Sequence, residues 1–120
     1  MITFEMFRLE SNLDSFSAND IVFRQGDART VMYVVKEGEV DIKIGGKIVE
    51  TVGPNGIFGE MAMVDGQPRT ASAIARTDCK LVPIDQKRFQ FLIQQTPYFA
   101  LQVMQLLVER LRRADKLIEA

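Results

Sequence analysis

The residues best suited to chemistry lie in one short segment, 58–73, which reads Phe-Gly-Glu-Met-Ala-Met-Val-Asp-Gly-Gln-Pro-Arg-Thr-Ala-Ser-Ala. It holds the carboxylate of Glu60 and the guanidinium of Arg69. The planar fork of an arginine suits two phosphate oxygens at once, and a carboxylate accepts hydrogen bonds from hydroxyl groups. A ligand that carries both a phosphate and hydroxyls would use the two side chains together, and a nucleotide is such a ligand.

The local sequence around these two side chains predicts a tight turn and one turn of helix. Gly59 permits an unusual backbone angle or the close approach of another group. Residues 60–64 are expected to form a short helical turn, whose free N–H groups would add an anion site. Residues 65–66, Asp-Gly, indicate a turn, and Pro68 keeps the chain extended ahead of Arg69.

Two parts of this segment resemble a known motif. The sequence Phe-Gly-Glu-Met-Ala at 58–62, followed by Pro-Arg-Thr-Ala at 68–71, is similar to the phosphate-binding cassette of cyclic-nucleotide-binding domains. That family includes catabolite-activator-type regulators, protein kinase A regulatory subunits and cyclic-nucleotide-gated channels. The resemblance extends over nearly the whole chain, including Gly-Asp at 26–27, Gly-Glu-Val at 38–40 and Gly56. It implies a mainly β fold, a β-roll of jelly-roll type with an N-terminal helix and two C-terminal helices.

The resemblance also implies a role for each cassette residue. Arg69 would pair with the cyclic phosphate, and Glu60 would accept a hydrogen bond from the ribose 2′-hydroxyl. Gly59, Met61 and Ala62 would place backbone N–H groups near the ribose and phosphate. A purely structural interpretation makes Arg69 a strand-edge residue and Glu60 the capping carboxylate of a short helix.

Further residues are expected around the base of the ligand. In the family, a threonine at the position of Thr70 can touch the phosphate or a guanine amino group. Arg110 or Arg113 would act as a lid by stacking on the base. By analogy, three apolar strand residues would line the base pocket: Ile42, Val49 and Val52.

Composition describes one domain, residues 1–120, with enough apolar residues, 47%, for a packed core. The net charge of −1 provides no basic field toward nucleic acid, so this chain alone is not expected to bind it. No apolar run is long enough to span a membrane. The N-terminal segment carries an acid and lacks a basic-then-apolar secretory signal pattern, which predicts a cytoplasmic location.

No catalytic constellation is present in the sequence. The chain has no histidine and a single cysteine, Cys79. This argues against histidine-based catalysis, against histidine metal sites, and against a haem or iron–sulfur cluster held by this chain. We therefore expect neither an enzyme nor a cofactor or metal, and we interpret Cys79 as a small buried strand residue.

The predicted elements follow the alternation and turn signals along the chain. Residues 1–13 suggest an amphipathic helix or turn. Strands are expected at 13–16, 21–24, 31–36, 39–44, 47–52, 69–75 and 80–84, which together make a roll over about residues 13–84. Helices are expected over 85–95, with Asp85 as its N-cap, and over 97–118.

The last helix carries an apolar stripe at heptad spacing: Ala100, Met104, Leu107, Leu111, Ala114 and Ile118. Such a stripe can pack on its own domain or form the seam of a parallel dimer. The resemblance favours the seam, because catabolite-activator-type proteins pair through this helix.

The sequence thus predicts a sensor module that binds cAMP or cGMP and converts occupancy into movement of its C-terminal helix. Two alternatives remain open. One is a ligand-free interaction or dimerisation module, and the other is the sensor fragment of a longer transcription regulator or channel. The chain ends without a helix-turn-helix segment, as either a free-standing module or a fragment would, and its start at Met1 favours a free-standing protein.

Overall fold

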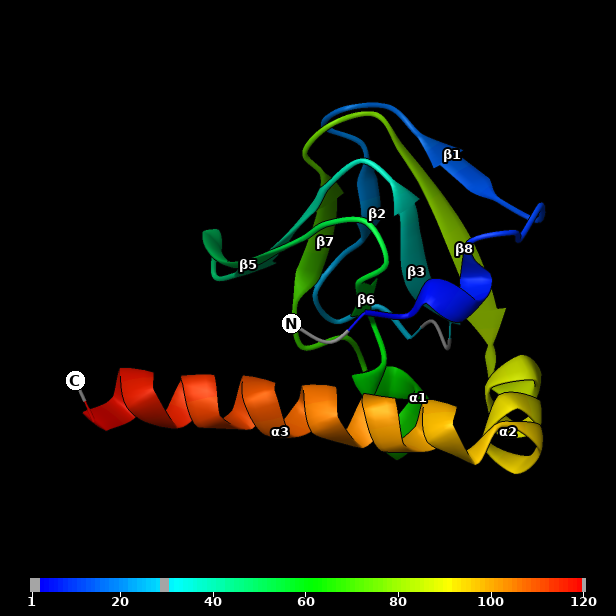
Figure 1. The fold of residues 1–120 in the computed structure, drawn as a ribbon. Coiled ribbons are helices and arrows are strands. Elements are labelled where there is room, and N and C mark those ends of the chain that lie inside the picture. Colours follow the sequence, from blue (N-terminus) through cyan, green and yellow to red (C-terminus); the bar gives the residue numbers. More distant parts are fainter. Residues whose placement is uncertain (1–2, 29–30, 120) are drawn as a thin grey trace.

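The structure is a computed structural model that describes residues 3–28 and 31–119, with side chains described as far as residue 116. Within those residues, eight strands form two antiparallel sheets of four strands each. One sheet has the order β1 (Asp14–Phe16), β8 (Cys79–Asp85), β3 (Val31–Glu37), β6 (Ile57–Phe58). The other has the order β2 (Ile21–Phe23), β7 (Ser72–Ala75), β4 (Val40–Ile44), β5 (Lys47–Val52). The two sheets face each other (Figure 1), which confirms the predicted β-roll.

The β3 strand lies at the centre of the fold because both of its faces are covered. Tyr33 and Val35 point toward the second sheet, into a cluster in which the Tyr33 ring stacks on Phe58 of the neighbouring strand β6, with 5.4 Å between the ring centres. Met32 and Val34 point the other way, into a second cluster that the helices complete. A strand buried on both sides reads as a continuous apolar run rather than an alternating one, as residues 31–35 do.

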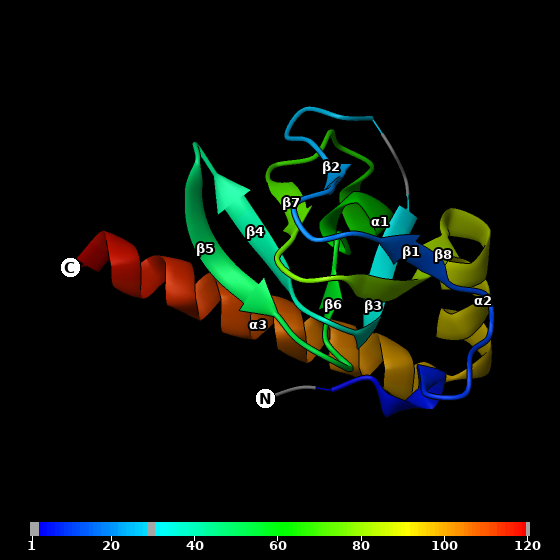
Figure 2. The same ribbon diagram turned by 90° about the horizontal axis from the view of Figure 1, so that it is seen from above.

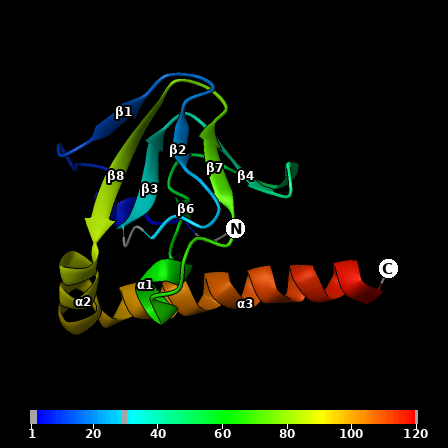
Figure 3. The same ribbon diagram turned by 180° about the vertical axis from the view of Figure 1, so that it is seen from behind.

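Two helices follow the roll. The first, α2 (Gln86–Gln95), begins where predicted, since the Asp85 side chain accepts a hydrogen bond of 2.8 Å from the backbone N–H of Arg88. The second, α3 (Pro97–Glu119), lies along one side of the roll, and its C-terminal half runs beneath the β4–β5 hairpin (Figures 1 and 3). The ring of Phe99, fully buried, joins α3 to the rest of the core.

The expected N-terminal helix is reduced to a single 3-10 turn, η1 (Glu5–Phe7). Phe4 and Phe7 hold this segment by edge-to-face contacts with Phe99, at 5.9 and 6.1 Å between ring centres. In Figure 2 the segment runs beside α3, near the start of that helix. Because the two rings are already buried, a longer helix is not needed to anchor the N-terminus.

Two strand predictions differ from the structure. The strand expected over 69–75 begins at Ser72, because Arg69 is turned into the interior rather than paired in the sheet. The two-residue strand β6 was not predicted, since it is too short to show alternation. The helical turn expected at 60–64 is α1 (Met61–Asp65), one residue later.

The α3 helix packs on the roll mainly through side chains beside the predicted stripe, together with Leu107 of the stripe itself. Phe99, Val103 and Leu106 are buried, and Leu107 is half-buried. An apolar strip that shares Met104 and Leu111 with the predicted stripe is exposed: Leu101, Met104, Val108 and Leu111. Ala100 is half-buried and Ala114 exposed, while the side chain of Ile118 lies outside the described residues.

Candidate functional site

A cavity of about 570 Å³ lies between the cassette segment, the β4–β5 hairpin and α3. The structure brings every predicted site residue to its wall: Gly59, Glu60, Met61, Ala62, Arg69, Thr70, Arg110 and Arg113. Ile42 and Val49 also line it, as the analogy predicted. Val52 does not, because it points between the sheets and is part of the core.

Arg69 is held from several sides at this wall, although it carries a full charge. Its side chain is buried, and Nη1 donates a hydrogen bond of 3.0 Å to the carbonyl oxygen of Gly59. Nη2 donates to the carbonyl oxygen of Val31, and the guanidinium lies 4.0 Å from the ring centre of Phe23. These contacts orient a cation in a largely desolvated place, where it is suited to bind an anion.

Gly59 makes this arrangement possible. Its φ of +79° lies in the left-handed region, which residues with a β-carbon adopt at a cost. A β-carbon at this position would also meet Nη1 of Arg69 at 2.8 Å. The backbone angle therefore favours the glycine predicted from sequence, and a β-carbon there would force the Arg69 guanidinium to shift.

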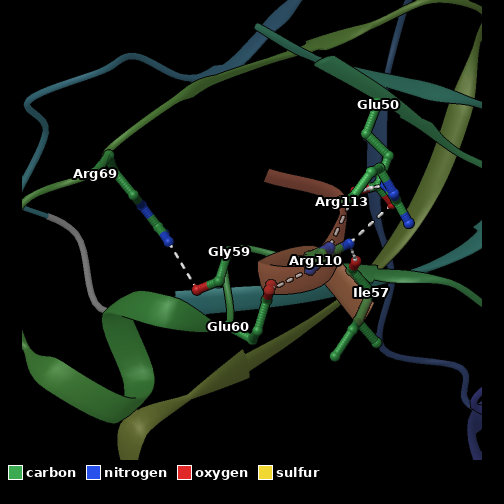
Figure 4. Close-up of polar contacts among 7 residues, drawn as sticks. All are labelled: Glu50, Ile57, Gly59, Glu60, Arg69, Arg110 and Arg113. Atoms are coloured by element: carbon green, nitrogen blue, oxygen red, sulfur yellow. Dashed lines mark hydrogen bonds and ion pairs between the residues drawn. The ribbon is translucent and has the colours of Figure 1, made fainter. Parts of the chain in front are cut away.

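Glu60 precedes α1 but does not cap it. Its backbone is already helical, with φ −68° and ψ −26°, and its side chain accepts no capping hydrogen bond. The carboxylate is instead directed into the site (Figure 4), where it pairs with Nη1 of Arg110. With only 2% of the residue exposed, this is a buried charge whose described partner comes from the C-terminal helix.

Arg110 connects α3 to two separate parts of the roll. Besides Glu60, it forms a two-bond contact with Glu50, with Nε and Nη2 at 3.0 and 3.1 Å from the carboxylate oxygens. Nη2 also donates to the carbonyl oxygen of Ile57 at 2.8 Å. Burial disfavours the charged form, but Glu60 and Glu50 outweigh it and raise the pKa of Arg110.

Arg113 contacts the same carboxylate, at 3.1 Å from Oε1 of Glu50. The two predicted lid arginines therefore share one partner on β5, as Figure 4 shows. Sequence reasoning missed Glu50 as a site residue. In strand β5 it looks like one residue of an ordinary polar and apolar alternation, and nothing in the pattern links it to a helix sixty residues further along the chain.

The rest of the wall is mostly apolar and would suit a flat ring. It includes side chains from β4, β5 and α3: Ile42, Ile44, Val49, Leu107, Leu111 and Ala114. The charged side chains of the cavity wall thus lie in the cassette segment and where Arg110 and Arg113 of α3 meet Glu50. The wall between the β4–β5 hairpin and α3 is otherwise apolar. In the residues that the structure describes, the acidic and cysteine side chains form no cluster that could hold a metal ion. None of the described helices combines the length and the apolar character that a membrane span needs.

A β-roll with a buried arginine and glutamate on one cavity, closed by a C-terminal helix, defines a small-ligand-binding domain. The family model described as "Cyclic nucleotide-binding domain" matches residues 13–96. The chain therefore belongs to the cyclic nucleotide-binding domain family.

Individual relatives agree with this assignment. Over 72 residues, 60% of this chain, the sequence is 38% identical to a cAMP-dependent protein kinase regulatory subunit of Eremothecium gossypii, of which it spans 16%. The catabolite activator protein of Thermus thermophilus superposes with a TM-score of 0.81 at 31% identity, over 89% of this chain and 53% of that one. The EAL enzyme Bd1971 in its cGMP-bound form gives 0.67 at 28% identity, over 87% and 29% of the two chains.

Proposed function

We propose that the chain is a sensor module that binds cAMP or cGMP in the cavity and couples occupancy to the position of α3. The observation that carries the proposal is the placement of two buried, oppositely charged side chains, Arg69 and Glu60, on the wall of one cavity. Burying charges is costly, so an arrangement that keeps both at a cavity wall is typical of a binding site.

In this proposal the cyclic phosphate lies against Arg69, and backbone N–H groups of Gly59, Met61 and Ala62 lie nearby. The ribose 2′-hydroxyl donates to Glu60. The purine then occupies the apolar part of the cavity between the hairpin and α3, with Thr70 near the phosphate or the base. Among the relatives, the EAL enzyme Bd1971 has been solved in cGMP-bound and cAMP-bound forms, which supports testing both nucleotides.

Coupling to α3 follows from the contacts of Arg110. This residue reaches the proposed ribose site from α3, so a ligand that bonds to Glu60 changes the surroundings of a helix residue directly. A ligand shifts the position of α3 only by as much as it binds one position better than another.

We propose a regulatory role for the chain, without catalysis and without a cofactor. A cytoplasmic location and the absence of nucleic-acid binding by this chain remain predictions.

The test is calorimetric titration of the purified chain with cAMP and cGMP, after removal of any copurified nucleotide. We expect binding that Arg69→Gln weakens by about 2–5 kcal/mol, because the phosphate loses its charged partner. Arg76→Gln is the matched control, since Arg76 is exposed and lies outside the cavity wall. If neither nucleotide produced heat, the sensor function would be wrong, and a ligand-free module would take its place.

A second proposal, that the chain pairs with its own copy through α3, has a specific observation in its favour. Leu101, Met104, Val108 and Leu111 are exposed and follow heptad spacing. We expect Val108→Glu to convert a dimer into a monomer in analytical ultracentrifugation, because Val108 is on this strip but not on the cavity wall. Arg112→Glu, also exposed on α3, should leave the mass unchanged.

A further inference from the structure

The C-terminal half of α3 has little apolar anchorage to the roll. Among the α3 side chains that the structure describes, which end at residue 116, the last buried one is that of Leu106, and Leu107 is half-buried. From residue 111 to residue 116 every side chain is exposed. The ion pairs that Arg110 and Arg113 make therefore have a large share in holding this half of the helix over the cavity.

Both arginines contact Glu50. Its Oε1 lies 3.0 Å from Nε of Arg110 and 3.1 Å from Nη1 of Arg113, and its Oε2 lies 3.1 Å from Nη2 of Arg110. The Glu50 and Arg110 side chains are 23% and 20% exposed, so water screens this pair less than an ordinary surface pair. Glu50 is thus the main polar connection between the β4–β5 hairpin and α3.

A β-bulge aims Glu50 at the helix. In the β4–β5 ladder Ile42 pairs with Glu50, and Lys43 pairs with Ile48, which leaves Val49 as an extra residue. In a regular strand, neighbouring side chains point to opposite faces, yet Val49 and Glu50 both line the cavity. Bulges of this kind re-aim a side chain and are frequent next to functional sites.

We propose that Glu50 is a positioning residue that latches α3 over the cavity and so controls how fast ligand enters and leaves. This rests on the proposed function for its ligand, but the latch is a property of the chain itself. With α3 latched, Arg69 and Glu60 are buried, and movement of the helix or hairpin away from the cavity would expose them to a nucleotide. Glu50 lies outside the cassette, and its role is to hold Arg110 and Arg113 rather than to bind phosphate or ribose.

The latch predicts a particular kinetic signature. In stopped-flow experiments with cAMP labelled by a fluorophore at C8 of the adenine, Glu50→Gln should raise the association and dissociation rate constants together, each by about tenfold. The dissociation constant should change by less than either rate constant. A residue that only touches ligand behaves differently, since loss of a contact acts mainly on dissociation.

Two further variants make the test specific. Arg113→Gln removes the outer arginine and leaves the Arg110 contacts, so both rate constants should rise by a smaller factor. Glu37→Gln is the matched control, because Glu37 is exposed, pairs with Lys80 at 3.9 Å and is absent from the cavity wall. It should leave both rate constants unchanged.

Amide hydrogen exchange tests the latch without ligand. In Glu50→Gln the amides of residues 110–116 should exchange faster, while those of α2 keep their wild-type rates. Unchanged exchange, or a change in dissociation alone, would overturn the latch. If the wild-type chain bound no cyclic nucleotide, the proposed function would fail by itself, and the exchange experiment would still decide the role of Glu50.

Discussion

A β-carbon on residue 59 would come within 2.8 Å of Nη1 of Arg69, so the glycine and the arginine of the cassette occupy mutually dependent positions. The same Nη1 donates to the Gly59 carbonyl oxygen, and the φ of Gly59 is +79°. The backbone of Gly59 and the side chain of Arg69 therefore hold each other in position. The orientation of the cation is a property of the pair rather than of Arg69 alone.

We accordingly expect Gly59→Ala to displace the guanidinium as well as strain the backbone. The strain alone should cost about 1–3 kcal/mol of folding free energy, and displacement of Arg69 should weaken cyclic nucleotide binding further. Urea unfolding and calorimetric titration measure the two effects separately.

Gly66→Ala is the control for this prediction. Gly66 also has a positive φ, +66°, but a β-carbon there would meet no atom within 4 Å. It should lose stability and keep most of its affinity. Equal losses of affinity in the two variants would show that strain in the cassette, not contact with Arg69, explains the effect.

The fold also depends on the ring of Phe99. It contacts the rings of Phe4, Phe7 and Phe89 and is fully buried. Phe99→Ala should destabilise the protein by about 3–5 kcal/mol, because a large ring leaves a cavity among three others. Phe91→Ala, in α2 and 60% exposed, should change the melting temperature little. Similar shifts in the two variants would contradict this account of the core.

The sequence was sufficient for the cassette and most of the strands because those signals are local. Alternation in β4 and the capping side chain of Asp85 depend on residues close in the chain. Local pattern was not sufficient for Glu50, whose role depends on a bulge in β5 and on two arginines of α3. The sequence also could not show which face of α3 packs on the roll, because that face is set by the docking of the helix at Phe99.

Cys79 is a buried, free cysteine whose surroundings favour the neutral thiol. Burial, followed by the nearby charges of Asp78 and Asp20, raises the pKa of its thiol. The folded chain at pH 8 should react slowly with iodoacetamide and quickly once unfolded in urea. Mass spectrometry measures both rates, and equal rates would contradict the buried position.

The raised pKa also predicts a dependence of stability on pH. Unfolding releases a thiol of ordinary pKa, about 8.5, which ionises before the folded one. The stability that Cys79 provides is therefore complete below this value and declines as pH rises above it, by at most about 1.4 kcal/mol per pH unit. Cys79→Ala should remove that part of the decline, which is seen by comparing urea unfolding of the two proteins between pH 7 and 9.5.

Glu60 allows the proposed ribose contact to be tested with ligand and protein together. If Glu60 accepts the 2′-hydroxyl, then 2′-deoxy-cAMP should bind the wild type more weakly by about 1.5–3 kcal/mol, as expected for a hydrogen bond to a charged group. In Glu60→Gln the hydroxyl loses its charged acceptor, so the difference between cAMP and 2′-deoxy-cAMP should become small. Arg110 keeps Glu50 and the Ile57 carbonyl in this variant, so α3 should remain in place. A full 2′-hydroxyl effect that persisted in Glu60→Gln would place the ribose elsewhere in the cavity and leave Glu60 as a structural partner of Arg110.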